Sequence, residues 1–199
     1  MAMRVGVFGG TFDPPHRAHL RVALAASDAL TLDRLLWIPA GQPPHKEESG
    51  VSAPRHRAEM TRLMSEADPR FGLDLGELDA PGPSWTILTL ERLRREHPQW
   101  DLVLVMGEDQ WASFSTWHRP NDILAMAEVA VYHRPHTETA QAPDHPTHDY
   151  LPDYWLPGEC LSHTSTMIRD TIRRGKPVDH LVLPSVAAYI RQHHLYGLS

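Results

Sequence analysis

The sequence predicts an α/β fold with a doubly wound, mostly parallel sheet. Short apolar segments rich in β-branched residues recur along the chain, helical patterns separate them, and DLVLVMG at 101–107 has the unbroken apolar character of a central strand. Strands joined through helices run parallel, and such sheets bind ligands at the carboxyl ends of their strands. We therefore expect ligand-binding loops after Phe8, Ile38 and Val105.

The first half of the chain alternates between strand-like and helix-like segments. RVGVF is β-branched and ends at Gly9-Gly10, and a Pro-rich turn separates it from an Ala- and Leu-rich helix. A loop that contains Gly, Pro and His follows the second strand. In chain order, the expected elements are a strand at 4–8, a helix at 17–30, a strand at 34–40 and a helix at 54–67.

The second half repeats this alternation and adds a long irregular segment. Ser84 can cap the helix that continues through Glu96. Residues 133–158 are rich in Pro, His and Asp with weak periodicity, so we expect a surface loop there. The remaining expected elements are strands at 71–78, 101–107 and 128–132 and helices at 165–174 and 184–194.

Length and composition limit the class of protein. The 199 residues, 41% of them hydrophobic, are enough for one buried core, so residues 1–199 are expected to form a single domain. The 19 Lys and Arg against 25 Asp and Glu give a net charge of −6, which argues against nucleic-acid binding. Neither a signal peptide nor an apolar stretch of about 18 to 20 residues is present, so we expect no membrane association and a cytoplasmic location.

Several familiar nucleotide-binding and catalytic motifs are absent. The sequence has neither G-x-G-x-x-G nor G-x-x-x-x-G-K-[ST], so any phosphate must be bound by another arrangement. G-x-S-x-G and H-E-x-x-H are also missing. Cys160 is the only cysteine, which excludes an intrachain disulfide and an all-cysteine metal site, and it lacks the neighbours of a nucleophile.

The segment GGTFDPPHRAHL is the first candidate site. Gly9 and Gly10 let backbone amides approach a ligand, and His16 and His19 share one face at the start of a helix. Amides at a helix N-terminus and two imidazoles form a suitable anion site. An isolated H-x-x-H is more often a pair of surface histidines, and a zinc pair lacks a third ligand with suitable spacing.

Residues far from this segment can bind the same anion. Ser165 and Thr166 begin a helix that they can cap, or they can donate to a phosphate that Arg169 reaches one turn later. Asp109, two residues after Gly107, can accept from a ribose hydroxyl or cap a helix.

Three further candidates lie in expected loops. His45 and Lys46 follow the second strand, where a cation can close over a substrate phosphate, although a solvated loop charge is the commoner role. Arg134 follows a strand and can meet the adenine or phosphate side of a cleft, and a surface arginine explains it nearly as well.

Two separated motifs resemble those of the nucleotidylyltransferases. GGTFDPPHRAHL resembles the signature G-G-T-F-D-P-x-H-x-G-H, and TSTMIR at 164–169 resembles S-S-T-x-I-R. PPHK at 43–46, GPSWT at 82–86 and GED at 107–109 followed by Trp117 are similar to one branch, the bacterial nicotinate-nucleotide adenylyltransferases.

Two positions depart from the family pattern. Ala18 stands where the family has Gly, and Thr164 stands where it commonly has Ser. Ala is favoured over Gly inside a helix, so we expect a small steric adjustment at Ala18, and Thr164 retains the hydroxyl.

The resemblance implies a Rossmann-like enzyme that transfers the adenylyl group of ATP to nicotinate mononucleotide and releases deamido-NAD and pyrophosphate. The implied catalytic residues are His16, His19 and Arg169. The implied ATP-binding residues are Gly9, Gly10, Thr11, His16, His19, Gly107, Asp109, Ser165, Thr166 and Arg169. The expected substrate-binding residues are His45, Lys46, Ser84, Trp85, Thr86, Trp117 and Arg134. Among them, the resemblance implies that the backbone near Thr86 holds the pyridine carboxylate and that Trp117 stacks on the ring.

Metal use, acceptor and assembly complete the expectations. Mg2+ is expected to be carried by ATP oxygens and water rather than by dedicated protein ligands. The acceptor could instead be nicotinamide mononucleotide or another phosphorylated metabolite. A second alternative is a nucleotide sensor without turnover, for which Ala18 is the only support. The sequence is also compatible with a homo-oligomer.

Overall fold

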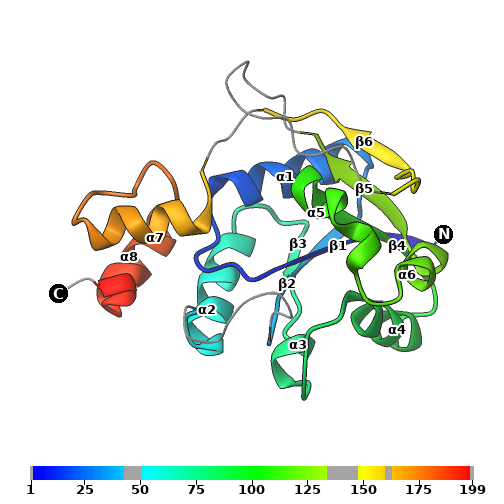
Figure 1. Cartoon of the computed structure of the whole chain (residues 1–199), viewed down its shortest axis with the longest axis horizontal. Helices are drawn as coiled ribbons and strands as arrows, with labels where there is room; N and C mark the ends of the chain where they lie inside the picture. Colours follow the sequence, from blue (N-terminus) through cyan, green and yellow to red (C-terminus); the bar gives the residue numbers. More distant parts are fainter. Residues whose placement is uncertain (1, 43–50, 134–147, 160–162, 198–199) are drawn as a thin grey trace.

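A parallel sheet forms the centre of the protein. The structure, a computed structural model, describes residues 2–42, 51–133, 148–159 and 163–197. Within these ranges six parallel strands form one sheet in the order β3-β2-β1-β4-β5-β6 (Figure 1). The strands are β1 (Met3–Gly10), β2 (Arg34–Pro39), β3 (Phe71–Leu73), β4 (Trp100–Gly107), β5 (Glu128–Tyr132) and β6 (Tyr154–Leu156). The predicted doubly wound α/β fold is confirmed.

The direction of the strand order reverses between β1 and β4. β1 pairs with β2 on one side, where Val5 lies opposite Arg34, and with β4 on the other, where Val5 lies opposite Leu102. The chain therefore builds one half of the sheet outward from β1 and the other half outward from β4. Loops that leave two such strands diverge and open a crevice, and here the strands end at Gly10 and Gly107.

Alternating side chains divide the core between the two faces of the sheet. In β4, Val103 and Val105 belong to one buried cluster, while Leu102 and Leu104 belong to the other. Successive side chains of a strand point to opposite faces, and both faces are apolar because helices cover both.

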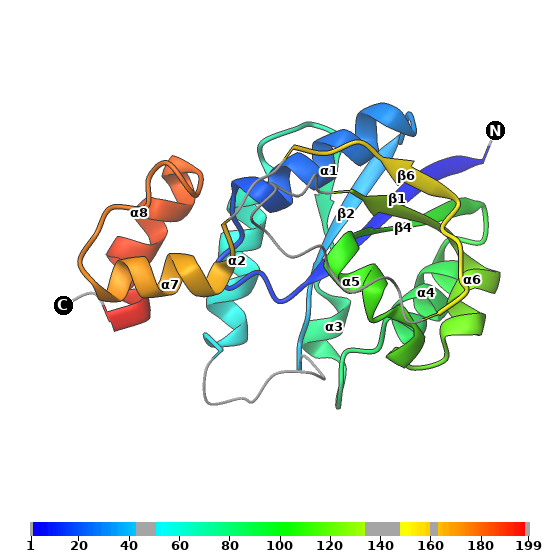
Figure 2. The same ribbon diagram turned by 45° about the horizontal axis from the view of Figure 1, so that its top comes forward.

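The helices cover the sheet in two groups. Residues of α1, α2, α7 and α8 pack in the cluster that contains Val103, and residues of α4, α5 and α6 pack in the cluster that contains Leu102. α7 and α8 lie at one end of the molecule (Figure 1, Figure 2), where α8 packs against α2. None of the described helices is long and apolar enough to cross a membrane. The helices are α1 (Arg17–Ala29), α2 (Pro54–Ser65), α3 (Gly76–Asp79), α4 (Thr86–Glu96), α5 (Glu108–Ala112), α6 (Pro120–Met126), α7 (Ser165–Arg173) and α8 (Pro184–Gln192).

The strand predicted at 71–78 is wrong in its second half. β3 ends at Leu73, after which Asp74 Oδ1 accepts a hydrogen bond from the Gly76 backbone N–H at 3.0 Å. Arg92 donates to the same oxygen at 2.5 Å and holds it in place. An Asp side chain that bonds the backbone two residues on forms a turn, so the chain bends there and α3 begins.

Further short elements, among them α5, α6 and β6, lie outside the predicted pattern. α5 and α6 follow β4, and β6 lies within 133–158, where a surface loop was expected. β6 has only three residues, and its Trp155 is 51% exposed. A strand this short at the edge of a sheet has too little apolar alternation to be predicted. Residues 134–147 of the expected loop lie outside the described residues.

The predicted cap of α4 is wrong by one residue. Trp85 is the N-cap, and its side chain makes no capping hydrogen bond. Ser84 Oγ instead accepts hydrogen bonds from the backbone N–H groups of Gly41 at 2.8 Å and Gln42 at 3.2 Å. Ser84 thus joins the start of α4 to the loop after β2.

The cap of α7 lies before the two residues that were predicted to cap it. Thr164 is the N-cap, and its Oγ1 accepts from the Met167 backbone N–H at 3.2 Å. Ser165 and Thr166 are the first two helical residues. Their hydroxyl groups are therefore not used to cap the helix.

Replacing Thr164 by alanine should lower the free energy of unfolding by about 1 kcal/mol, because the Met167 amide loses its cap. Thr171→Ala is the matched control, since Thr171 Oγ1 donates to the Met167 carbonyl at 2.8 Å inside the same helix and caps nothing. This control should change stability by less than about 0.5 kcal/mol. Urea denaturation measures both variants, and equal losses would contradict the capping role.

Candidate active site

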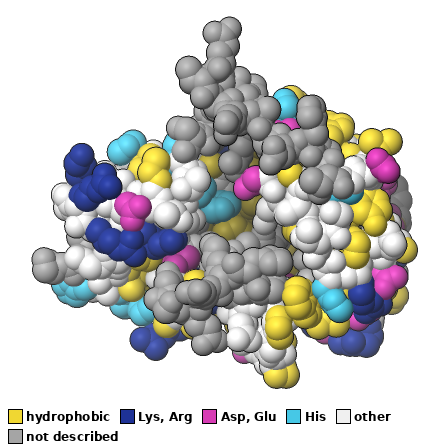
Figure 3. All heavy atoms as spheres, in the orientation of Figure 1, with side chains coloured by type: hydrophobic (Ala, Val, Ile, Leu, Met, Phe, Trp, Pro, Cys, Tyr) yellow, Lys and Arg dark blue, Asp and Glu magenta, His cyan; other side chains and the backbone are white. Residues whose placement is uncertain are grey.

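A cavity of about 420 Å³ opens at the carboxyl ends of β1 and β4. In Figure 3 the face of the molecule is hollowed near its centre. Many of the predicted site residues line the cavity, although they come from segments that are far apart in the sequence. These residues are Gly9, Gly10, Thr11, His19, Ser84, Trp85, Thr86, Gly107, Asp109, Trp117 and Ser165.

Gly9 and Gly10, at the end of β1, lack a side chain for different structural reasons. A Cβ atom on Gly10 would lie 2.8 Å from the ring of Phe12, so a side chain there would displace a buried aromatic residue. A Cβ atom on Gly9 would meet nothing within 4 Å. Since Gly9 lines the cavity, its missing side chain leaves space in which a ligand can approach the backbone.

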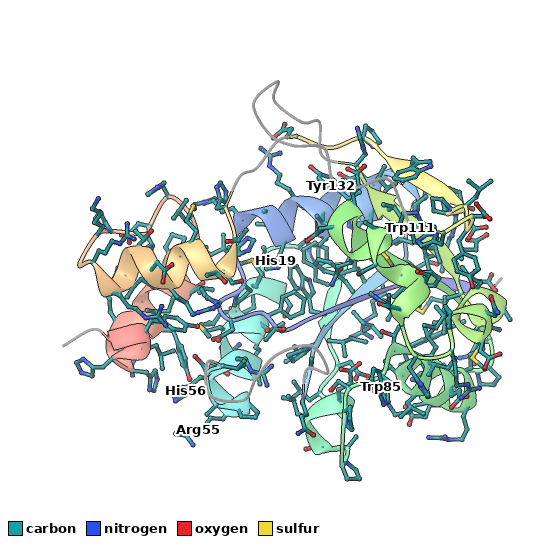
Figure 4. All side chains as sticks on the ribbon, in the orientation of Figure 1. His19, Arg55, His56, Trp85, Trp111 and Tyr132 are labelled. Atoms are coloured by element: carbon teal, nitrogen blue, oxygen red, sulfur yellow. The ribbon has the colours of Figure 1, made fainter. Side chains whose placement is uncertain are left out.

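The two predicted histidines have different positions at the start of α1. His16 is the N-cap and is 3% exposed, and its ring stacks on that of His19 with centroids 3.8 Å apart. The His16 backbone N–H donates to His19 Nδ1 at 3.2 Å. A neutral His19 therefore carries its proton on Nε2, which makes that nitrogen a hydrogen-bond donor. Of the two, His19 lines the cavity, and Figure 4 places it at the N-terminal end of α1, beside the centre of the molecule.

Ala18, the departure from the family signature, lies on the interior side of α1. It is 2% exposed, and it is not among the residues that line the cavity. Its methyl group therefore does not narrow the ligand space.

The second signature meets the first at the start of α7. Ser165 Oγ donates to the Pro14 carbonyl at 3.0 Å, and Arg169 donates to the Asp13 carbonyl at 2.8 Å. Arg169 also donates to Thr166 Oγ1 at 3.2 Å. Ser165 lines the cavity, whereas Thr166, the next residue of α7, and Arg169, one turn further along, are not among its lining residues. The three side chains are thus held beside the loop that joins β1 to α1.

Aromatic residues form another wall of the cavity. The ring of Trp85 lies 5.0 Å from that of His118, and Trp117 packs against Phe114 with centroids 5.5 Å apart. In Figure 4 Trp85 lies on the α3 and α4 side of the molecule, away from His19. We call the part of the cavity wall formed by Trp85 and Trp117 the aromatic side, and the part formed by His19 the imidazole side.

Asp109 does not cap a helix. Gly107 is the N-cap of α5, and Asp109 lies in the first turn with its side chain exposed at the cavity wall. The capping role considered for Asp109 is therefore wrong, and acceptance of a hydrogen bond from a ribose hydroxyl stays a prediction.

Three predicted substrate-binding residues fall in parts of the chain that the structure does not describe. His45, Lys46 and Arg134 lie outside the described residues. Their roles stay predictions.

Glu77 lines the cavity and was missed in the sequence. Thr89 Oγ1 donates to Glu77 Oε1 at 2.5 Å. Burial raises the pKa of Glu77, and hydrogen bonds from Thr89 and Ser84 oppose this increase. Glu77 lies within 71–78, which was predicted as a strand, so its position at the cavity was not predicted.

Arg57 is a buried arginine that organises the loops behind the cavity. It is 1% exposed, and its guanidinium donates to the carbonyls of Thr11 at 3.1 Å, Gly41 at 2.9 Å, Ser52 at 3.1 Å and Ala40. Burial lowers the pKa of Arg57, and the nearby charge of Asp13 opposes this decrease. Its position on the apolar stripe of its helix was the signal that could have revealed it.

The expectation that Mg2+ is carried by ATP oxygens and water stays a prediction. Within the described ranges, no group of three or more His, Cys, Asp or Glu side chains is arranged to hold a metal ion. Of the carboxylates that line the cavity, Asp109 is exposed and Glu77 is bonded to Thr89. Phosphate and water oxygens are the ligands that Mg2+ prefers in nucleotide sites.

Comparison with known proteins identifies the family. Residues 7–171 match the family model described as cytidylyltransferase-like. The chain belongs to this family. It is 39% identical to a relative from Hydrogenovibrio crunogenus and 40% identical to one from Dechloromonas aromatica, and the alignments cover 96% and 98% of this chain and 97% and 99% of the relatives. Both relatives are named "Probable nicotinate-nucleotide adenylyltransferase", so the predicted resemblance is confirmed.

Solved structures agree on the fold. The structure of the Plasmodium falciparum nicotinic acid mononucleotide adenylyltransferase complexed with NaAD is similar to that of this chain, with a TM-score of 0.75 and 15% sequence identity. The similarity covers 99% of this chain and 98% of the P. falciparum chain. The two proteins therefore share the arrangement of elements from end to end.

Glu77→Gln should become more stable relative to the unchanged protein as the pH rises from about 4.5. Above this ordinary pKa an unfolded glutamate loses its proton, while the buried Glu77, with its raised pKa, keeps it. The native state then binds more protons than the unfolded state, so its stability falls with rising pH, and glutamine does not contribute to that fall.

Urea denaturation of both proteins at several pH values measures this difference. Glu66→Gln is the control, because the Glu66 side chain is 59% exposed. A difference between Glu77→Gln and the unchanged protein that stays constant with pH would contradict the raised pKa.

Proposed function

We propose that this protein transfers the adenylyl group of ATP to nicotinate mononucleotide and forms deamido-NAD and pyrophosphate. The observation that carries the proposal is one cavity at the carboxyl ends of β1 and β4, lined by residues of both signature segments and of GPSWT. The names of the curated relatives support the same reaction, as does the NaAD bound in the P. falciparum enzyme of similar fold.

The reaction needs positioning and charge stabilisation more than a strong base. A phosphate oxygen of the mononucleotide attacks the α-phosphorus of ATP, and the bond from that phosphorus to the oxygen bridging to the β-phosphate breaks. Pyrophosphate leaves with that electron pair. The attacking phosphate is already anionic at neutral pH, so the barrier lies in aligning two polyanions and stabilising the leaving group.

The imidazole side of the cavity supplies the donors for the triphosphate. His19 Nε2–H donates to the phosphates, and His16 supports the ring of His19 from behind. Backbone amides of Gly10 and Thr11 add fixed donors. Ser165, Thr166 and Arg169 are assigned to the β and γ phosphates. Mg2+ carried by ATP supplies neutralising charge when bound.

The aromatic side of the cavity is assigned to the pyridine ring. Trp117 offers a flat face for stacking, and the backbone near Thr86, at the start of α4, offers N–H groups for the ring carboxylate. Lys46 is assigned to the attacking phosphate, His45 to substrate binding beside it, and Arg134 to the adenine or phosphate side of the cleft. Because the chain has a net charge of −6, local donors must overcome long-range repulsion of these anions.

Pyrophosphate release tests the proposed reaction. Mg-ATP is offered with nicotinate mononucleotide, nicotinamide mononucleotide or phosphopantetheine, together with a control without acceptor. We expect rapid release with the nicotinate acceptor. Faster release with another acceptor would show that the proposed acceptor is wrong. ATP binding without pyrophosphate release from any acceptor would contradict the proposed activity and favour a nucleotide sensor.

His19→Asn should reduce turnover by about two to three powers of ten with little loss of stability. An asparagine oxygen can still accept from the His16 backbone N–H, but no donor remains at the position of Nε2. Losing one preorganised donor costs about 3 to 4 kcal/mol of transition-state stabilisation.

Steady-state kinetics and thermal melts of three variants make this test specific. His19→Ala removes both roles, and His97→Ala is the control because His97 stacks on Trp100, at the opposite end of β4 from the cavity. Turnover of His19→Asn equal to that of the unchanged protein would remove His19 from the mechanism.

A further inference from the structure

Tyr196 lies in the C-terminal turn at Leu195–Gly197 and contacts the loop between β1 and α1. Its hydroxyl donates to Asp13 Oδ1 at 2.7 Å, although the two residues are 183 positions apart. Asp13 is 1% exposed, so this carboxylate has little access to water. A buried charge of this kind depends on its hydrogen-bond donors, and Tyr196 is one of them.

Asp13 connects three parts of the site. Its Oδ2 accepts from the Ser52 backbone N–H at 3.0 Å, and its carbonyl accepts from Arg169 at 2.8 Å. The Ser52 carbonyl in turn accepts from buried Arg57, which also holds the Thr11 carbonyl. A shift of Asp13 would therefore move Arg169 and the backbone of the loop between β1 and α1 together.

The backbone at Tyr196 is adapted to this contact. Tyr196 has φ 64°, in the left-handed region that a bulky residue rarely adopts, and His194 has φ 49°. Such conformations persist where the surroundings require them. Here they turn the Tyr196 side chain inward to Asp13. Burial, followed by the charge of Asp13, raises the pKa of Tyr196, so the hydroxyl remains protonated and continues to donate.

We propose that Tyr196 is a positioning residue for ATP: through Asp13 it fixes the loop between β1 and α1 and the guanidinium of Arg169 in the geometry that the triphosphate needs. This inference rests on the proposed function for its kinetic consequence. Tyr196 itself touches no reacting atom.

The Tyr196→Phe variant tests the proposal. It removes one hydroxyl and keeps the ring, and we expect kcat/KM for Mg-ATP to fall about tenfold. Tyr189→Phe is the matched control, since the Tyr189 hydroxyl bonds His56 Nδ1 at 2.9 Å and joins the same C-terminal region to α2 without reaching Asp13. This control should lower the melting temperature comparably and leave kcat/KM for Mg-ATP unchanged.

A second measurement needs no variant. Adding a nonhydrolysable ATP analogue to the unchanged protein should slow amide hydrogen exchange at 194–197 as well as at 9–19. Slowing confined to 9–19, or equal kinetic losses in the two tyrosine variants, overturns the proposal. Failure of the unchanged protein to release pyrophosphate would overturn the proposed function instead, and the exchange measurement would still decide the coupling.

Discussion

The pairing of β1 between β2 and β4 is the constraint on which the rest of the structure depends. It places the ends of two glycine-terminated strands beside each other and sends the following loops in opposite directions. The cavity lies where those loops separate. The guanidinium of buried Arg57 then donates hydrogen bonds to carbonyl groups in the loops after β1 and β2, at Thr11, Ala40 and Gly41. Sheet geometry thus sets the location of the site, and one guanidinium sets much of its shape.

Strong apolar periodicity made the larger elements predictable from sequence. The central strands and α1, α2, α4, α7 and α8 all lie where their patterns indicated them. The failures occurred where particular hydrogen bonds, from a side chain or between neighbouring strands, decide the backbone conformation rather than apolar periodicity. Asp74 turns the chain after β3 through a bond to the Gly76 amide, and β6 forms by pairing with β5 at a distance in sequence. Neither contact has a local apolar signature.

The site residues that belong to short sequence motifs were predictable, whereas the others were not. Gly9, His19 and Ser165 lie at the cavity as expected, because each belongs to a segment with a defined place at a strand end or helix start. Glu77 and Arg57 escaped because their roles come from burial among distant residues. The different environments of His16 and His19 could not be predicted either. A spacing of three residues places both side chains on one helix face, but it does not determine which ring lines the cavity.

The contact between Asp13 and Tyr196 has a consequence for synthesis in the cell. A chain emerging from the ribosome exposes its N-terminal segments first, and the loop between β1 and α1 is made long before its partners in α7 and the C-terminal turn. Until about residue 196 has emerged, the carboxylate of Asp13 lacks the hydroxyl donor of Tyr196, although the Ser52 backbone N–H can already bind its other oxygen. A nascent chain can therefore form its sheet before the loop between β1 and α1 is fully fixed, and under the role proposed for Tyr196 the ATP site is completed late in translation.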